Sequence, residues 1–437
     1  MSIGAITAII FGCMILGLSL GLPVAFVLGG VAIVFSFFLW GPASLLNVPL
    51  STVALMKTIV LVPIPLFVFM AILLERSGII DDLYEMIYRW AGPVRGGLAM
   101  GTVLISTIVA AMSGIVGAGT VTMGLIALPS MLKRGYHKGI AIGCVCAGGA
   151  LGQLIPPSVD LILYGFIAKE SVGRLFAGGL IPGLILSSLF ITYIAIRCAI
   201  QPHMGPALPP EERVTWKQKF VSIRAVLLPI LLVVGVLGSI FAGLATPTEA
   251  AAVGATGAII CAAIYRRLSW GTLKEAAFRT LRTTSLCLWI VLGATIFAAV
   301  YQALGATELL KEILAGTPGG RWGVMLTIQL TFFLMGMFMD DVAIMMIATP
   351  IFLPVIKALG FDPVWFGVLF IVNMQMGFLT PPYGFTLFYI RGVAPKGVTM
   401  GDIYRSVWPF VLLQGVGLAV VMIFPNLILW LPNLIFG

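Results

Sequence analysis

The chain has 437 residues, of which 60% are hydrophobic and only 9% are charged, and its formal net charge is +9. Soluble domains carry about a quarter charged residues, so this composition excludes a soluble enzyme, a disordered protein and a secreted disulfide scaffold. The class that remains is a polytopic, all-α membrane protein, because apolar segments of span length recur along the whole chain.

The apolar segments predict a series of membrane-spanning helices. The first forty residues contain no lysine or arginine, so their two helices, joined near Gly21-Leu22-Pro23, are expected to be retained rather than cleaved as a signal peptide. The six cysteines form no CxxC pair and are expected to pack as small apolar residues. We expect spans at residues 3–20, 22–40, 61–76, 138–168, 176–198, 225–243, 247–265, 284–303, 364–391 and 407–431.

Two further apolar stretches, 97–132 and 321–358, are broken in the middle, the first at Ser113-Gly114 and the second at Asp340-Asp341. Each arm has about 15 to 19 residues, which is short for a span at a rise of about 1.5 Å per residue. We therefore expect two re-entrant helical hairpins. Two full antiparallel helices with a tight turn remain the alternative.

The positive charges predict the orientation in the membrane. When the loops are assigned to alternating sides, with each hairpin returning to the side from which it entered, 19 of the 25 lysines and arginines fall on one side. By the positive-inside rule that side is cytoplasmic, and both termini face outward. In a membrane protein this distribution accounts for the net positive charge without nucleic-acid binding.

Part of the sequence recurs at one constant separation along the chain, which we call the repeat spacing, and this recurrence indicates a duplication. In the predicted topology the first hairpin opens to the cytoplasm and the second to the outside, so the copies are expected to be inverted, as in secondary transporters. The positions that match at the repeat spacing are Pro129 and Pro354, Gly135 and Gly360, Gly152 and Gly377, Pro156 and Pro381, Pro157 and Pro382, and Tyr164 and Tyr389.

Each copy has two adjacent prolines inside an apolar segment, at Pro156-Pro157 and Pro381-Pro382. Proline lacks the backbone donor and clashes with the preceding turn, so both segments are predicted to be broken helices. Unwound backbone at membrane depth is tolerated where it lines a cavity, where its carbonyls can bind a cation and the restarted half-helix favours an anion. Simple proline kinks are the alternative.

Four carboxylates lie within apolar stretches and are candidates for ion or proton binding. Asp340 and Asp341, at the tip of the second hairpin, are the strongest candidates. Glu249 fits a helix N-cap better than a site. Asp160, which follows the first double proline, is expected to cap the restarted half-helix, which would leave Ser158 nearer the site.

Amphipathic stretches at 79–90 and 306–315 precede the two hairpins. They are expected to lie in the membrane interface, either as arms between a mobile and a fixed module or as ordinary loop helices. The predicted domain organisation is N-terminal scaffold helices at 1–60, a first repeat at 61–200, a cytoplasmic loop with two helices and an amphipathic connector at 201–283, and a second repeat at 284–437.

Several motifs follow one another over nearly the whole chain: Ile64-Pro65-Leu66-Phe67, Arg95-Gly96-Gly97-Leu98-Ala99, Ser113-Gly114, Leu151-Gly152-Gln153-Leu154-Ile155-Pro156-Pro157-Ser158, Ala177-Gly178-Gly179-Leu180-Ile181-Pro182-Gly183, Thr246-Pro247-Thr248-Glu249-Ala250-Ala251-Ala252, Met339-Asp340 with Pro350 and Pro354, and Thr380-Pro381-Pro382-Tyr383-Gly384. With these motifs in this order, the chain resembles the large membrane subunit of tripartite ATP-independent periplasmic (TRAP) transporters, the DctM-like family.

The resemblance implies an elevator-type transporter in the bacterial inner membrane that imports small organic anions, carboxylates or sulfonates, and is driven by sodium ions. Besides membrane lipid, it implies two partners, a periplasmic substrate-binding protein and a small four-helix membrane subunit. No enzymatic activity is expected. The anion itself is not specified, because no arginine that could bind a carboxylate or sulfonate lies at the deduced centre.

The resemblance also implies the residues of two sodium sites, one at each hairpin tip, and of a substrate site between them. Ile115 and Val116 follow Ser113-Gly114 where family members often have serines, so backbone carbonyls are expected to bind the first ion. The first sodium site would consist of Ser113, Gly114, Gly152 and Pro156, and the second of Asp340, Asp341, Gly377 and Thr380. The expected substrate contacts are Ser113, Gly114, Ser158, Thr380 and Tyr383.

Three other functions compete with this interpretation. An autonomous divalent-anion/sodium symporter built on similar hairpins would need no binding protein. An intramembrane aspartyl protease would need two separated aspartates that face each other, whereas Asp340 and Asp341 are adjacent and point roughly 100° apart on a helix. An ion channel would not need two inverted hairpins with broken helices.

Overall fold

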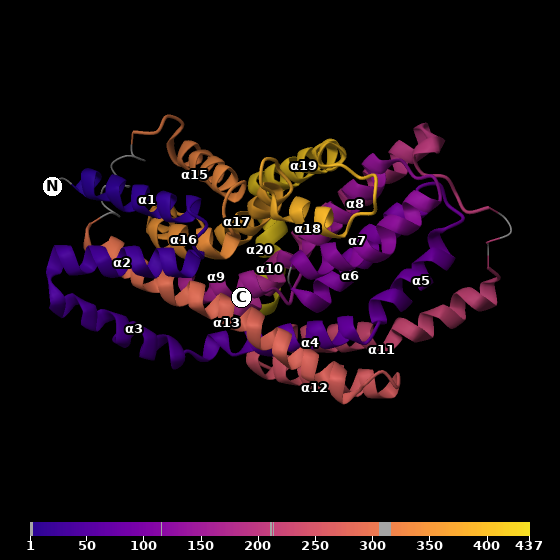
Figure 1. Cartoon of the computed structure of the whole chain (residues 1–437), viewed down its shortest axis with the longest axis horizontal. Helices are drawn as coiled ribbons and strands as arrows, with labels where there is room; N and C mark the ends of the chain where they lie inside the picture. The colour runs from indigo at the N-terminus through magenta and orange to yellow at the C-terminus, as the bar shows by residue number, and fades with distance from the viewer. Residues whose placement is uncertain (1–2, 115, 210–211, 213, 306–315) are drawn as a thin grey trace.

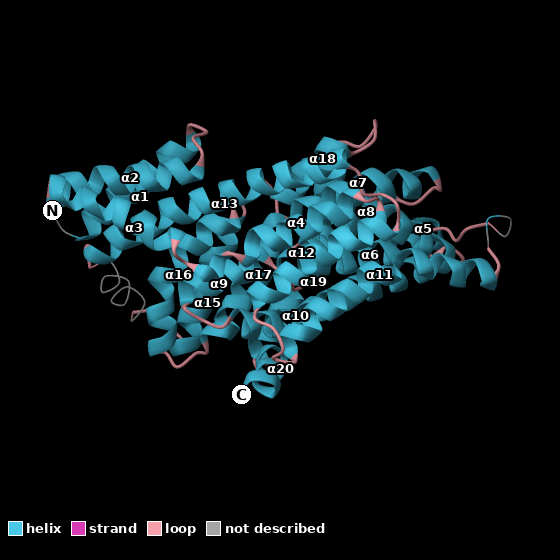
Figure 2. Cartoon of the chain, turned by 90° about the horizontal axis from the view of Figure 1, so that it is seen from below, coloured by secondary structure: helices cyan, strands magenta, loops and turns pink. Residues whose placement is uncertain are grey.

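The structure is a computed structural model that describes residues 3–114, 116–209, 212, 214–305 and 316–437. Over these residues the regular elements are all helices, as predicted, and none is a strand. The molecule is elongated, with the N-terminal helices at one end and the C-terminus near the middle (Figures 1 and 2).

The N-terminal helices form one end of the molecule. Helices α1 (Ile3–Ser19) and α2 (Val24–Trp40) turn at Gly21, whose φ of 77° suits glycine, and at Pro23, which begins the second helix. After α2, the short segment η1 (Pro42–Leu46) and helix α3 (Asn47–Met56) lead back toward the centre, where η2 (Ile59–Leu61) joins α4 (Pro63–Arg76) (Figure 1). Helix α3 was not predicted.

The first amphipathic stretch is a helix, α5 (Ile79–Ala91), that buries Ile79, Leu83 and Ile87 on one face, which confirms its predicted amphipathic character. The first hairpin follows as α6 (Gly97–Ser113) and α7 (Val116–Lys133). The break between them lies where the sequence predicted it. The second amphipathic stretch, 306–315, lies outside the described residues.

The first double proline breaks its helix. α8 (Lys138–Ala150) and the turn η3 (Leu151–Gln153) end before the prolines, and α9 (Val159–Ala168) restarts after them. The long helix α10 (Val172–Ile200) comes next. Ser158 caps α9 by accepting a bond from the backbone N–H of Leu161, so the expectation that Asp160 is the cap was wrong; Asp160 lies inside the helix.

The middle of the chain supplies three long helices after η4 (Pro202–Met204): α11 (Trp216–Phe241), α12 (Pro247–Ile264) and α13 (Trp270–Ala303). Thr246 and Glu249 form a reciprocal capping box at the start of α12, which confirms the capping role expected for Glu249. Helix α13, with 34 residues, is much longer than the predicted span 284–303.

The second half of the chain repeats the pattern of the first. The second hairpin is α15 (Gly320–Gly336) and α16 (Asp341–Ala358), and the second broken helix is α17 (Pro363–Phe378) and α18 (Phe385–Val393). The predicted span 407–431 is not one helix: α19 (Met400–Ile423) and α20 (Asn426–Phe436) are separated at Pro425.

Within the described residues, six helices are long and apolar enough to cross a membrane, or seven if the bent helix α11 is one span. They are Ile59–Arg76, which joins η2 and α4, and α10, α12, α13, α16 and α19. Helices α1, α2, α6 and α17 are apolar but shorter, so several predicted spans exist as helices without reaching full span length.

The two halves of the chain interlock at the centre. Helix α7 of the first hairpin packs against α18, and helix α16 of the second hairpin packs against α9. Around this centre, α13 runs diagonally along the molecule beside α2, α4 and α16 (Figure 1). The helix breaks of both halves therefore meet in the interior.

Candidate functional site

The tip of the first hairpin rests directly on the first broken helix. Gly114 has a φ of 61°, and a Cβ atom placed on it would lie 2.4 Å from the carbonyl oxygen of Pro157. Only glycine fits such a position, because it tolerates positive φ and leaves room for the neighbouring backbone. The structure thus brings the predicted Ser113-Gly114 tip to the predicted Gly152–Pro157 turn.

At the second hairpin, Asp340 occupies the N-cap of α16, where its carboxylate accepts a hydrogen bond from the N–H of Val342 at 3.2 Å. Gly377, near the end of α17, lies close to α15, the first arm of this hairpin. A Cβ atom on Gly377 would be 3.0 Å from the Cα of Gly336. Both double-proline peptide bonds, Pro156-Pro157 and Pro381-Pro382, are cis.

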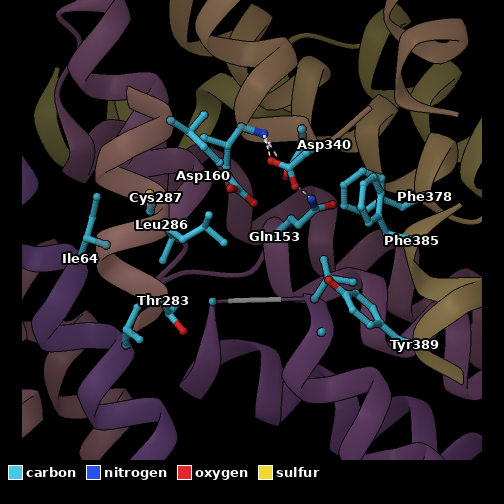
Figure 3. Close-up of a pocket in the computed structure, with 18 residues that line it drawn as sticks. Ile64, Gln153, Asp160, Thr283, Leu286, Cys287, Asp340, Phe378, Phe385 and Tyr389 are labelled. Carbon is cyan, nitrogen blue, oxygen red and sulfur yellow. Dashed lines mark hydrogen bonds between the residues drawn. The ribbon is translucent and has the colours of Figure 1, made fainter. Parts of the chain in front are cut away.

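A cavity of about 320 Å³ lies between these breaks (Figure 3). Both halves of the chain line it, and several lining residues are related by the repeat spacing. The middle of α13 and the start of α4 close another side. The lining pairs at the repeat spacing are Val116 and Asp341, Gly117 and Val342, Gln153 and Phe378, and Asp160 and Phe385.

A hydrogen bond joins the two halves inside the cavity. The Nε2 group of Gln153, from the first broken helix, donates to Oδ2 of Asp341, at the second hairpin tip (Figure 3). The other carboxylate oxygen of Asp341 accepts from the N–H of Val342 at 2.9 Å. Among the described residues, none is a hydrogen-bond partner of Gln153 Oε1, although the side chain is only 2% exposed.

The eight predicted sodium ligands fall into two groups. Gly114, Asp340 and Asp341 line the cavity. Five others lie in the hairpin tip or helix breaks without lining it: Ser113, Gly152, Pro156, Gly377 and Thr380.

Of the four hydroxyl groups expected to bind substrate, those of Ser158 and Thr380 are engaged elsewhere. Ser158 donates to the carbonyl of Gln153 besides capping α9, and Thr380 donates to the carbonyl of Met376 at 2.7 Å. Ser113 is buried, and its Oγ has no hydrogen-bond partner in the part of the chain that the structure describes. Tyr383 is 58% exposed and does not line the cavity; its ring lies beside Phe388.

Sequence reasoning missed several lining residues. Gln153, Phe378 and Tyr389 stand in or beside the repeated motifs, and the repeat spacing between Gln153 and Phe378 is a signal that could have identified both. Thr283 and Cys287 come from α13, which lies outside the repeated breaks, and no local pattern marks them. In the described part of the chain, no group of three or more His, Cys, Asp or Glu side chains is arranged to hold a metal ion.

Known proteins with a similar sequence are transport permeases. The chain is 31% identical over 405 residues to the C4-dicarboxylate TRAP transporter large permease protein DctM of Pseudomonas aeruginosa, covering 92% of this chain and 93% of that protein. It is 29% identical to the ectoine TRAP transporter large permease protein TeaC of Halomonas elongata, covering 98% and 100%. It is 30% identical to the isethionate TRAP transporter permease protein DctMQ of Oleidesulfovibrio alaskensis, covering 88% and 60%.

Solved structures share the fold. The YdaH transporter of Alcanivorax borkumensis superimposes with a TM-score of 0.61 at 14% identity, covering 94% of this chain and 97% of that one. MtrF of Neisseria gonorrhoeae gives a TM-score of 0.59, also at 14% identity, covering 88% and 84%. At this identity the likeness concerns the fold alone.

The match to a protein family extends over nearly the whole chain. Residues 11–427 match the family described as tripartite ATP-independent periplasmic transporter, DctM component. Relatives named as transport permeases also agree with the expectation that the chain is not an enzyme. The chain belongs to the DctM component family of tripartite ATP-independent periplasmic transporters.

Proposed function

We propose that this chain is the large permease of a sodium-driven importer of small organic anions, carboxylates or sulfonates, in the bacterial inner membrane. The observation that carries the proposal is the cavity where the hairpin tips and broken helices of both halves meet. Secondary transporters bind substrate and coupling ions at such breaks between repeats. The named substrates of the relatives, C4-dicarboxylates, ectoine, sialic acid and isethionate, are small organic acids.

Sodium is proposed as a transported coupling ion bound at the two hairpin tips. A hard cation takes oxygen ligands, including backbone carbonyls. At the first tip, the unpartnered Oγ of Ser113 and the carbonyl of Pro157 beside Gly114 are oxygens that fit this chemistry. At the second tip, Asp340 and Asp341 supply carboxylates near the end of α17, where Gly377 lies, and near the turn at Thr380.

The proposed mechanism is an elevator movement, which the arrangement of the helices supports. Sodium at the tips would offset the carboxylates and, with the half-helix N-termini, favour an anionic group of the substrate. The module that carries both hairpins would then slide between the membrane faces against the remaining helices. Coupling requires that sodium and substrate both favour the same loaded state by their differential affinities.

Two partners complete the proposed assembly. A periplasmic binding protein would deliver the substrate, and a small four-helix membrane subunit would associate with the permease. The relative named DctMQ supports this second partner, because this chain spans only 60% of its length.

Replacement of Asp340 by alanine tests the proposal. With the binding protein and small subunit present in proteoliposomes, sodium-dependent uptake should fall at least about tenfold, the loss that even outer-shell changes at a metal site cause. Asp81→Ala is the matched control, because Asp81 is an exposed carboxylate of α5. Undiminished uptake by the Asp340→Ala variant would refute the assignment.

Omission of the binding protein separates the proposal from its closest rival. Uptake should then stop. Rapid sodium-dependent uptake of free substrate by the permease without the binding protein would instead identify an autonomous divalent-anion/sodium symporter.

A further inference from the structure

The central cavity is unusually acidic for an anion site. Asp160, Asp340 and Asp341 all line it, and the described residues of its lining include no lysine, arginine or histidine. Among the described residues, no basic side chain makes an ion pair with any of these three aspartates. Buried carboxylates without a cationic partner are costly, and a sodium ion at the second tip would offset the charge of only one of the three, so they favour a further positively charged occupant.

The cavity also has an acceptor that lacks a donor. The side chain of Gln153 is 2% exposed, and its Nε2 group is already committed to Asp341, which fixes Oε1 as the free end of the amide. A buried acceptor without a donor costs the full desolvation of that group. Gln153 lines the cavity, and the group that satisfies its Oε1 must bring an N–H or O–H donor.

Aromatic rings form another part of the lining. Phe378, Phe385 and Tyr389 belong to α17 and α18, and the rings of Phe378 and Phe385 lie 5.0 Å apart between centroids (Figure 3). The faces of such rings attract organic cations. At the positions one repeat spacing earlier, Gln153 and Asp160 stand in place of Phe378 and Phe385, so one side of the cavity is polar and the other aromatic.

The size of the cavity distinguishes between a bare ion and a molecule. Its volume of about 320 Å³ lies in the range of small-molecule sites and exceeds the space that a sodium ion needs. A sodium ion at the hairpin tip would satisfy carboxylates and carbonyls, but it donates no hydrogen bond to Gln153 and does not use the aromatic wall.

We propose, on the basis of the proposed importer function, that the transported organic acids are those that also carry a protonated nitrogen. The ammonium or amidinium group lies among Asp160, Asp341 and Gln153, with the rings of Phe378 and Phe385 on its other side. The substrate is thus a zwitterion or an amino acid-like anion, and a plain carboxylate or sulfonate of the same size is a poor ligand.

Pairs of compounds that differ mainly in one nitrogen test the proposal. Taurine and isethionate share a two-carbon sulfonate and differ in an ammonium against a hydroxyl group, and L-aspartate is succinate with an added ammonium. Each is titrated against the purified permease at constant sodium and ionic strength, and the thermal unfolding midpoint is recorded. In at least one pair, the compound with nitrogen should bind about tenfold more tightly or better, as expected for a charge-assisted hydrogen bond.

Conservative variants connect the preference to the cavity. Asp160→Asn and Gln153→Leu should each reduce the preference for the nitrogen compound, whereas Asp81→Asn, on the exposed face of α5, should leave it unchanged. A preference that survives both cavity variants, or a wild-type chain on which the nitrogen compound of neither pair exceeds its partner, overturns the proposal.

A second measurement needs no substrate. In a Thr283→Cys variant whose six native cysteines, among them Cys287 of the lining, are replaced by alanine, the reaction rates with a cationic and an anionic methanethiosulfonate of similar size are measured. Each rate, divided by the rate of the same reagent with free cysteine, reports the electrostatic potential inside the cavity. The cationic reagent should react about tenfold faster, and Asp160→Asn should reduce the ratio. Equal rates overturn the inference about the substrate but do not contradict the proposal of sodium-dependent uptake. Conversely, loss of sodium dependence with the cation preference intact refutes only the proposed coupling.

Discussion

Gly114 is the residue at which the first hairpin depends most clearly on the absence of a side chain. It combines a φ of 61° with the 2.4 Å approach of a Cβ atom to the carbonyl of Pro157. Gly114→Ala should therefore push the hairpin tip away from the broken helix, at a cost of about 1–3 kcal/mol. We expect a lower thermal unfolding midpoint in detergent and a loss of sodium-dependent uptake.

The matched control for this prediction is Gly12→Ala. Gly12 lies within α1, and an added Cβ would meet nothing within 4 Å. Because alanine favours helix more than glycine does, this variant should be as stable as the original or slightly more stable. Equal stability and uptake of the Gly114→Ala variant would show that the tip does not need its close contact with Pro157.

Some residue roles could be read from the sequence and others could not. The tip residues and the double prolines were predictable, because glycine and proline have effects that act locally. The cap of α9 was misassigned, because a cap depends on the residue at which the helix begins, and that boundary is uncertain by one or two positions. The role of Gln153 depends on Asp341, which is 188 residues away, so no local pattern could indicate it.

At the scale of the elements, the loop after α10 connects the ends of the first-half helices that the charge pattern predicts to be cytoplasmic. Its backbone bonds to the segments on both sides of the hairpin: the N–H of Gly96 donates to Gly205 at 2.8 Å and that of His137 donates to Met204 at 3.1 Å. Glu212, farther along the same loop, accepts hydrogen bonds from Tyr88 of α5 and from Arg134 at the end of α7. The loop therefore holds α5 against the base of the first hairpin.

The hydrogen bonds that Glu212 accepts should make the stability of the folded chain depend on pH. The hydrogen bond from Tyr88, and then that from Arg134, lower the pKa of Glu212 below its ordinary value of 4.5. Because the pKa of Glu212 is lower in the folded chain than in the unfolded chain, its ionised carboxylate stabilises the folded chain. This stabilisation is present above the unfolded pKa and is lost as the pH falls through the folded pKa. The destabilisation caused by Tyr88→Phe, measured as a shift of the unfolding midpoint, should be larger at pH 7 than at pH 3.

Tyr404→Phe provides a control of the same chemistry. Tyr404 donates to the backbone carbonyl of Pro382 at 3.0 Å, and a carbonyl does not titrate in this range. Its removal should lower the midpoint equally at both pH values. If Tyr88→Phe also had the same effect at pH 7 and pH 3, Glu212 would not be the partner that matters.

The order of the helices was more predictable than their lengths. The hairpin arms α7 and α16 begin and end one repeat spacing apart, as the motifs indicated. The extension of α13 toward Trp270 was not predicted, because its first turns include Lys274, Glu275 and Arg279 and lack the apolar character by which spans were identified. Hydropathy finds the part of a helix that lipid or protein covers, whereas the backbone continues until a capping residue ends it.

At the scale of the whole molecule, the exchange of contacts between the halves explains how one cavity forms from two helix breaks. Each hairpin packs its second arm against the restarted helix of the other half, α7 against α18 and α16 against α9. The two tips are thereby held within one compact centre. Helix α4 packs mainly against α12 and α13, which places it with the surrounding helices, and it also contacts α6 of the first hairpin.

An elevator movement requires the first hairpin to slide past α4. In this structure Thr122 of α7 donates to Glu75 of α4 at 3.3 Å, so the two side chains mark a contact between the proposed mobile and fixed parts. In a Glu75→Cys, Thr122→Cys double variant, a short bifunctional methanethiosulfonate should join the two helices. Sodium-dependent uptake should then fall to background, and a reductant should restore it.

A second cysteine pair tests whether a loss of uptake results from restricted sliding or from general damage to the protein by cross-linking. Thr107 of α6 and Ser187 of α10 lie 2.8 Å apart between their hydroxyl oxygens, and both belong to the first half of the chain. Cross-linking the Thr107→Cys, Ser187→Cys variant should leave uptake unchanged, because α10 packs against α6 and α9 and is therefore assigned to the module that carries the hairpins. If uptake survives complete cross-linking between positions 75 and 122, then α7 does not slide past α4 and transport proceeds by local movement of the hairpin tips.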